Sequence, residues 1–169
     1  MTRRLLTNVV VALFLGATLG ATQSSSPLAD AAMRGDKDAV KKLLKEGADV
    51  GVAQGDGMTA LHWAAERGDA ELAQILLVAG ANASAVTRIG LYTPLHLAAK
   101  AASVDVVKAL IAGGADVNAR NAAGQTALEL VESMKPRVLD PIAEMIGIFD
   151  DGASPAETAA YLRKLLAAR

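Results

Sequence analysis

The chain contains no cysteine among its 169 residues. Disulfides, catalytic thiolates, thiolate metal sites and an acylated amino-terminal cysteine are therefore excluded. Aromatic residues are also scarce, at 3%, although hydrophobic residues reach 52%. The core must therefore consist of Ala, Leu, Val and Ile, which favours closely packed helices over a β-sandwich rich in aromatic and β-branched residues.

An excess of either charge is missing as well. The chain has 17 basic and 18 acidic residues and a net charge of −1. Nucleic-acid binding depends on neutralising phosphates with Lys and Arg, so we expect no nucleic-acid partner. The two histidines form no H-x-x-x-H pair, and no G-x-S-x-G nucleophile motif occurs. The sequence therefore predicts neither a metal or cofactor site nor an enzyme.

The amino-terminal segment differs from the rest of the chain. Arg3 and Arg4 precede an almost wholly apolar run, Leu5–Leu19, and small residues follow. This is the layout of a secretory signal peptide, so we assign residues 1–23 to one, with cleavage after Gly20 or Ala21. As a helix the run would span about 22 Å, less than the ~30 Å hydrocarbon core. We expect export to the periplasm or the medium without membrane attachment; an uncleaved membrane anchor is the alternative.

The remaining chain carries an internal repeat. "TALHWAAERGD" begins at Thr59 and "TPLHLAAKAAS" begins at Thr93, and each is followed by paired large aliphatic residues and by a "GAN" or "GAD" triplet. The same frame starts at Ser26 and, more weakly, at Thr126. Such an array indicates units that bury their apolar faces only against their neighbours.

Each unit is predicted to form two short helices. Thr59 and Thr93 are suited to cap a first helix, and Pro94 then takes the first helical position, where its missing N–H costs nothing. Glycine follows the second helix in the three clearest units, where a left-handed residue usually ends a helix; these are Gly47, Gly80 and Gly114.

In these motifs the chain resembles ankyrin repeats over roughly residues 26–130. The resemblance implies an all-α solenoid of about four helix–turn–helix units with short hairpin loops. The units would occupy residues 26–58, 59–92, 93–125 and, in degenerate form, 126–153, within a repeat region of 24–153. It also implies that the Thr and His of each T-x-L-H motif hydrogen-bond to each other.

The two histidines have two possible interpretations. A metal or acid–base pair needs rings that converge, because zinc binds imidazole nitrogens at about 2.0–2.1 Å. Equivalent positions in stacked helices lie about 8–10 Å apart, which favours one structural histidine per unit. We therefore expect structural roles for Thr59, His62, Gly80, Thr93, His96 and Gly114.

The end units depart from the pattern. The first unit has Ala29 in place of His, Asp30 in place of Trp63, and Lys42 on its second helix, as a water-facing unit requires. The fourth has Glu129 in place of His, and its second helix is expected at Pro141–Phe149. Residues 154–169, opening with Ser154, Pro155 and Glu157, predict a capping helix with an apolar stripe of Ala159, Leu162, Leu165 and Leu166; a free amphipathic helix is the alternative.

Without a chemical site, function is expected on the surface. In the family that this chain resembles, partners contact the hairpin tips and the exposed face of the first helices. The corresponding residues are Met58, Glu66, Arg67, Val86, Arg88, Ile89, Leu91, Tyr92, Lys100, Arg120 and Gln125. The stretch "TRIGLYT" has one residue more than its counterparts and carries large side chains at a turn, which is typical of interface anchors. Alternatively, Leu91 and Tyr92 pack against the adjacent repeat. Trp63 is predicted to lie in the core.

The sequence therefore favours an exported, monomeric, non-catalytic adaptor that binds an unidentified protein. A secreted effector or inhibitor that acts on a host or competitor protein shares these features and is the alternative. An enzyme would need a site in the irregular Ser133–Asp151 region, with Glu144, Asp150 and Asp151. These acids are better explained as facing water or capping the last helix.

Overall fold

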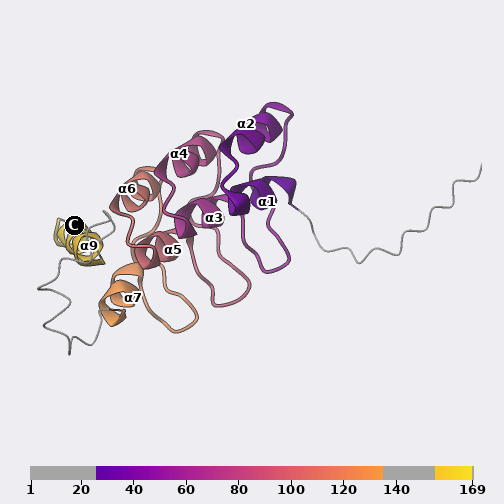
Figure 1. Cartoon of the computed structure of the whole chain (residues 1–169). Helices are drawn as coiled ribbons and strands as arrows, with labels where there is room; N and C mark the ends of the chain where they lie inside the picture. The colour runs from indigo at the N-terminus through magenta and orange to yellow at the C-terminus, as the bar shows by residue number, and fades with distance from the viewer. Residues whose placement is uncertain (1–25, 135–154, 169) are drawn as a thin grey trace, which may run out of the picture.

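The computed structural model describes residues 26–134 and 155–168. Within these ranges the chain forms eight helices and no strands, which confirms the all-helical solenoid (Figure 1). The helices are α1 (Pro27–Arg34), α2 (Lys37–Lys45), α3 (Ala60–Glu66), α4 (Ala70–Val78), α5 (Pro94–Lys100), α6 (Val104–Ala112), α7 (Ala127–Ser133) and α9 (Pro155–Ala167). The proposed signal peptide, the second helix of the fourth unit and the three acids of the irregular region lie outside the described residues.

Side-chain caps start most of these short helices. Ser26, Thr59, Thr93 and Thr126 each accept a backbone N–H at the start of a first helix. Asp36 and Asp69 do the same for α2 and α4. Helices of seven to nine residues are only marginally stable alone, so capping and packing must hold them. The glycines after α2, α4 and α6 have φ angles of 86°, 90° and 88°, the left-handed values expected there.

The helices form two rows (Figure 1). α1, α3, α5 and α7 pack side by side in the first row, and α2, α4 and α6 form the second row, which lies above the first in Figure 1. The hairpin loops project from the first row on the side away from the second row. This arrangement leaves the loop tips exposed, whereas the first helices are largely covered: every residue of α5 except Lys100 is buried.

The core between the rows is built from small and aliphatic residues. Paired alanines of the first helices are almost fully buried, and so are leucines of both rows; examples are Ala64, Ala65, Ala98, Ala99, Leu61, Leu76, Leu95 and Leu110. Alanine pairs let neighbouring helices approach closely. Trp63, which we expected in the core, is only half-buried at its edge.

The C-terminal helix α9 packs against α5, α6 and α7. Its buried face includes Thr158, Ala159 and Leu162, while Leu165 and Leu166 are half-buried. Arg163 pairs with Glu132 of α7, and the Lys108 ammonium of α6 lies 5.9 Å from the centre of the Tyr161 ring. α9 thus covers α6 and α7 much as α6 covers α4 and α5.

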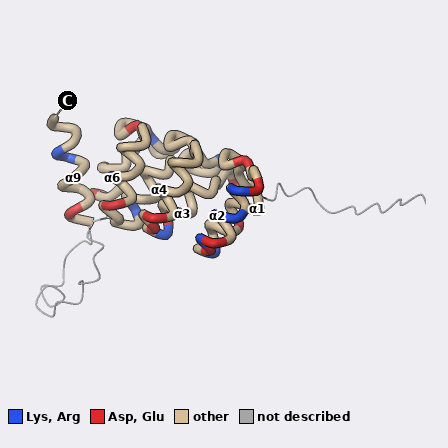
Figure 2. Tube along the Cα trace, turned by 90° about the horizontal axis from the view of Figure 1, so that it is seen from above, with Lys and Arg blue, Asp and Glu red and all other residues tan. Residues whose placement is uncertain are grey.

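Charged residues of both signs lie next to one another, as at the α1–α2 end (Figure 2). Lys42 and Glu46 of this end form one such pair, 3.9 Å apart. None of the described helices is both long enough and apolar enough to cross a bilayer.

Candidate interaction surface

Three hairpin loops connect the helix pairs, and one backbone hydrogen bond closes each of them. The amide that donates precedes the tip, and the carbonyl that accepts comes directly before the capping threonine. The pairs are Gln54 N to Met58 O at 2.8 Å, Thr87 N to Tyr92 O at 3.0 Å, and Asn121 N to Gln125 O at 2.9 Å. Further backbone bonds join each loop to the next: Arg88 N donates to Asp56 O at 2.8 Å, and Ala122 N donates to Gly90 O at 2.9 Å. The loops are therefore one connected layer.

The histidines tie this layer to the helices. Nδ1 of His62 lies 2.8 Å from the Thr59 hydroxyl and also accepts the Thr59 backbone N–H at 3.2 Å. Nε2 lies 3.1 Å from the carbonyl oxygen of Tyr92, in the hairpin loop that follows this helix pair. A carbonyl can only accept and the Thr59 N–H can only donate, so the ring must be neutral with its proton on Nε2.

The second motif repeats this arrangement. Nδ1 of His96 lies 2.8 Å from the Thr93 hydroxyl, and Nε2 lies 2.9 Å from the Gln125 carbonyl oxygen. Burial holds the pKa of both histidines below the ordinary value of 6.5, although the hydrogen bonds to the carbonyls act in the opposite direction. Both nitrogens of each ring are engaged, which leaves none to bind a metal. In the described ranges no three His, Cys, Asp or Glu residues gather as metal ligands would.

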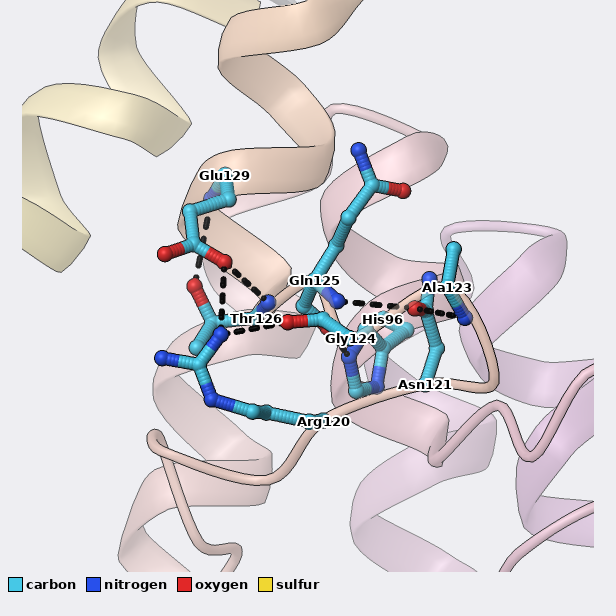
Figure 3. A network of polar contacts seen from close by, with 8 residues as sticks. All are labelled: His96, Arg120, Asn121, Ala123, Gly124, Gln125, Thr126 and Glu129. Atoms are coloured by element: carbon cyan, nitrogen blue, oxygen red, sulfur yellow. Dashed lines mark hydrogen bonds and ion pairs between the residues drawn. The ribbon is translucent and has the colours of Figure 1, made fainter.

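In α7, Glu129 takes the position that His62 and His96 hold in α3 and α5 (Figure 3). The Glu129 carboxylate accepts the Thr126 N–H at 2.9 Å, so it completes the cap as His62 and His96 do. Its other partner is Arg120, at 3.2 Å, which belongs to the loop before α7 rather than to a following unit. The pKa of Glu129 is lowered, first by the Thr126 backbone N–H.

In the first unit Ala29 stands in place of histidine, so no imidazole links the first helix to the loop that follows. Other side chains make this link. Gln54 donates to the Asp30 carboxylate and accepts the Trp63 indole N–H at 2.8 Å. Gln54 thus joins α1 to α3. The role of Gln54 was not evident from the sequence, because a glutamine in a polar turn looks like any exposed residue until both helices are placed.

The loop of residues 86–92, called the tip loop below, is the most unusual part of the layer. Leu91 has a φ of 49°, a left-handed value that is rare for a residue with a bulky side chain, and Gly90 before it has a φ of 80°. Thr87 is buried and holds the loop: its hydroxyl donates to the Ile89 carbonyl at 2.8 Å and accepts the Tyr92 N–H at 3.0 Å. The extra residue of this loop was evident from the sequence, whereas the buried threonine was not.

The tip loop also exposes apolar side chains. Val86, Ile89 and Leu91 are 52%, 76% and 46% exposed. They are three of the seven large hydrophobic side chains that are exposed in the described ranges. Tyr92, in contrast, is half-buried with its ring against Gly90 and edge-to-face with His96. Tyr92 therefore packs against the adjacent repeat, as the alternative interpretation had it, whereas Leu91 does not.

The other residues assigned to the partner surface fall into three groups. Met58 is only 9% exposed and packs in the core, so its inclusion was wrong; its position at a loop end turns the side chain inward. Glu66 and Lys100 are exposed at the ends of α3 and α5. Four more residues are already engaged: Arg67 with the Met33 carbonyl at 3.2 Å, Arg88 with the Gly55 carbonyl at 3.1 Å, Arg120 with Gly124 and Glu129, and the Gln125 carbonyl with His96.

Comparison with known proteins agrees with this architecture. A family model described as "Ankyrin repeats (3 copies)" matches residues 28–121. The chain is also 38% identical over 74 residues to the Homo sapiens protein named "Ankyrin repeat and SOCS box protein 16". That alignment covers 44% of this chain but only 16% of the relative, so the chain spans a small part of the relative's length. The stacked helix pairs, the Thr–His caps and the family match together show that the chain belongs to the ankyrin-repeat family.

Proposed function

We propose that this protein is an exported binding module that holds a partner protein with its tip loop and performs no chemistry itself. Ankyrin repeats are general protein–protein interaction modules. The observation that carries the proposal is the tip loop, where exposed Ile89 and Leu91 stand on a backbone fixed by hydrogen bonds to Thr87 and to both neighbouring loops.

Two features of this loop support a binding role. A non-glycine residue in the left-handed region costs about 1–3 kcal/mol, and such strain concentrates at functional sites. Exposed aliphatic side chains at a turn, where polar residues are usual, add a second unfavourable feature. Both are explained if a partner covers Ile89 and Leu91, because a loop already held in shape loses little entropy on binding.

Replacing Ile89 by Ser and Leu91 by Gly tests this role. Each removed anchor is worth about 1–2 kcal/mol at a typical interface, so we expect partner capture to fall at least tenfold. A photo-crosslinking residue at position 89 of the unmodified loop should capture the same partner directly. The matched control is Val78→Ser, since Val78 is 90% exposed but lies at the end of α4, away from the loop.

Stability measurements accompany the capture experiment. Glycine adopts a φ of 49° without strain, so the Leu91→Gly change should leave the free energy of unfolding unchanged within about 1 kcal/mol. Reduced capture then reports a lost contact and not an unfolded protein. Undiminished capture by the loop variant, or an equal loss with Val78→Ser, would show that the tip loop is not the binding site.

We further propose that the protein is exported, on the basis of Arg3, Arg4 and the apolar run that follows them. In the exported fraction, mass spectrometry should find a mature chain that begins at Ala21 or Thr22. An exported chain that retains Met1 would instead indicate a membrane-anchored protein. A chain found with Met1 inside the producing cell alone would contradict export.

A further inference from the structure

Both histidines converge on Tyr92, the residue that closes the tip loop. The imidazole of His62 donates to the Tyr92 carbonyl, which also accepts the Thr87 N–H that closes the loop. On the other side of this residue, the His96 ring stands edge-to-face with the Tyr92 ring, with centroids 6.1 Å apart and planes at 76°. The end of the tip loop is therefore fixed by the only two side chains of the chain that ordinarily titrate between pH 5 and 8.

Protonation of either histidine would disturb this arrangement at one atom, Nδ1 of the ring. The incoming proton must go to Nδ1, which in both rings now accepts a threonine backbone N–H, at 3.2 Å for His62 and 3.3 Å for His96. The threonine hydroxyl can rotate and accept the new N–H, but the backbone amide can only donate. A charged imidazolium therefore opposes its own helix cap and also places a positive charge in a buried site.

Little nearby charge compensates for that positive charge. Asp56, in the loop before α3, is the one charged side chain that acts on His62, where the Tyr92 and Ala85 carbonyls also contribute. For His96, the Gln125 carbonyl is the one compensating group among the described residues. Two further acids of the adjoining elements are bound elsewhere: Asp30 by Gln54, and Glu129 by Arg120 and Thr126.

We propose that the tip loop is an acid-responsive binding element, which loosens and releases its partner when His62 and His96 take up protons. This rests on the tip loop being the partner-binding site proposed above. An open loop exposes the rings, so it binds protons near the ordinary pKa of 6.5, whereas the closed loop does not. The free energy that favours the closed loop is therefore complete above pH 6.5 and decreases as the pH falls below it.

Hydrogen exchange in the free, full-length protein tests this inference. Protection factors, corrected for the intrinsic effect of pH, would be measured by NMR from pH 7.5 to 5.0. We expect the Thr87 amide, which closes the loop, to lose protection at acid pH. The loss should be about tenfold for each unit by which the pKa of a histidine rises when the loop opens. The reference is the Ala81 amide, which bonds to Leu76 O at 2.9 Å behind the first row and should keep its protection.

The double variant His62→Gln, His96→Gln provides the matched control. Glutamine at this position can still complete the cap with the threonine but does not titrate, so protection at Thr87 should become independent of pH. If the variant does not fold, the wild-type comparison of Thr87 with Ala81 decides alone. Equal loss at both amides means general acid unfolding and overturns the proposal, as does constant protection at Thr87 while the histidine rings titrate. None of these readouts involves a partner, so failure of the proposed binding function would be seen separately in the capture experiment.

Discussion

The Gly57→Ala protein is expected to be less stable than the wild type by about 1.5–3.5 kcal/mol. Gly57 has a φ of 89°, and a Cβ at this position would lie 2.5 Å from the backbone nitrogen of Arg88. Left-handed backbone costs about 1–2 kcal/mol for a residue with a side chain. The backbone of Arg88 must also move, which weakens its hydrogen bond to the Asp56 carbonyl, worth about 0.5–1.5 kcal/mol. Urea denaturation followed by circular dichroism measures the change.

Gly80→Ala is the control that separates strain from collision. Gly80 has nearly the same φ, 90°, but a Cβ there would meet no atom within 4 Å. Only the backbone term remains, so we expect a loss of about 1–2 kcal/mol. Similar losses at the two positions would show that the close contact between the first and second loops is absent in solution.

The Leu76→Ala protein is expected to lose about 3–5 kcal/mol. Leu76 lies in α4 with no exposed surface and belongs to the core between the rows. Removing a fully buried leucine side chain costs the transfer of its methyl groups and leaves a cavity, which together give losses of this size. Because repeat arrays can unfold in stages, Trp63 fluorescence should be followed together with circular dichroism.

Val78→Ala is the comparison, since Val78 lies two residues further along the same helix and is 90% exposed. Its replacement should change the free energy of unfolding by no more than about 0.5 kcal/mol. A large loss at Val78 together with a small one at Leu76 would mean that α4 presents its other face to the core.

The parts of the fold that depend on local spacing could be predicted from the sequence. The threonine and histidine of each motif lie three residues apart, so one turn of helix is enough to bring them together. The partner of the other histidine nitrogen lies 30 residues away for His62, and only the stacking of complete units places it. The caps were therefore predictable, whereas the bond from each histidine to the next loop was not.

Details of the candidate surface escaped prediction for a similar reason. One extra residue in the second hairpin signals an altered loop, but the count does not say which residue becomes left-handed. Gly90 adopts such a conformation at no cost, and Leu91 does so as well because Thr87 and the neighbouring loops hold the backbone on both sides. The inward side chain of Met58 likewise depends on how the first and second units stack.

The position of α9 affects how the protein is made. Val131 of α7 and Leu162 of α9 belong to the same core, yet α9 leaves the ribosome only after the whole stretch of chain between them. Until then the newest layer of the nascent protein keeps an apolar side uncovered. A chaperone that recognises such surfaces would have its longest opportunity there, at the growing edge of the array.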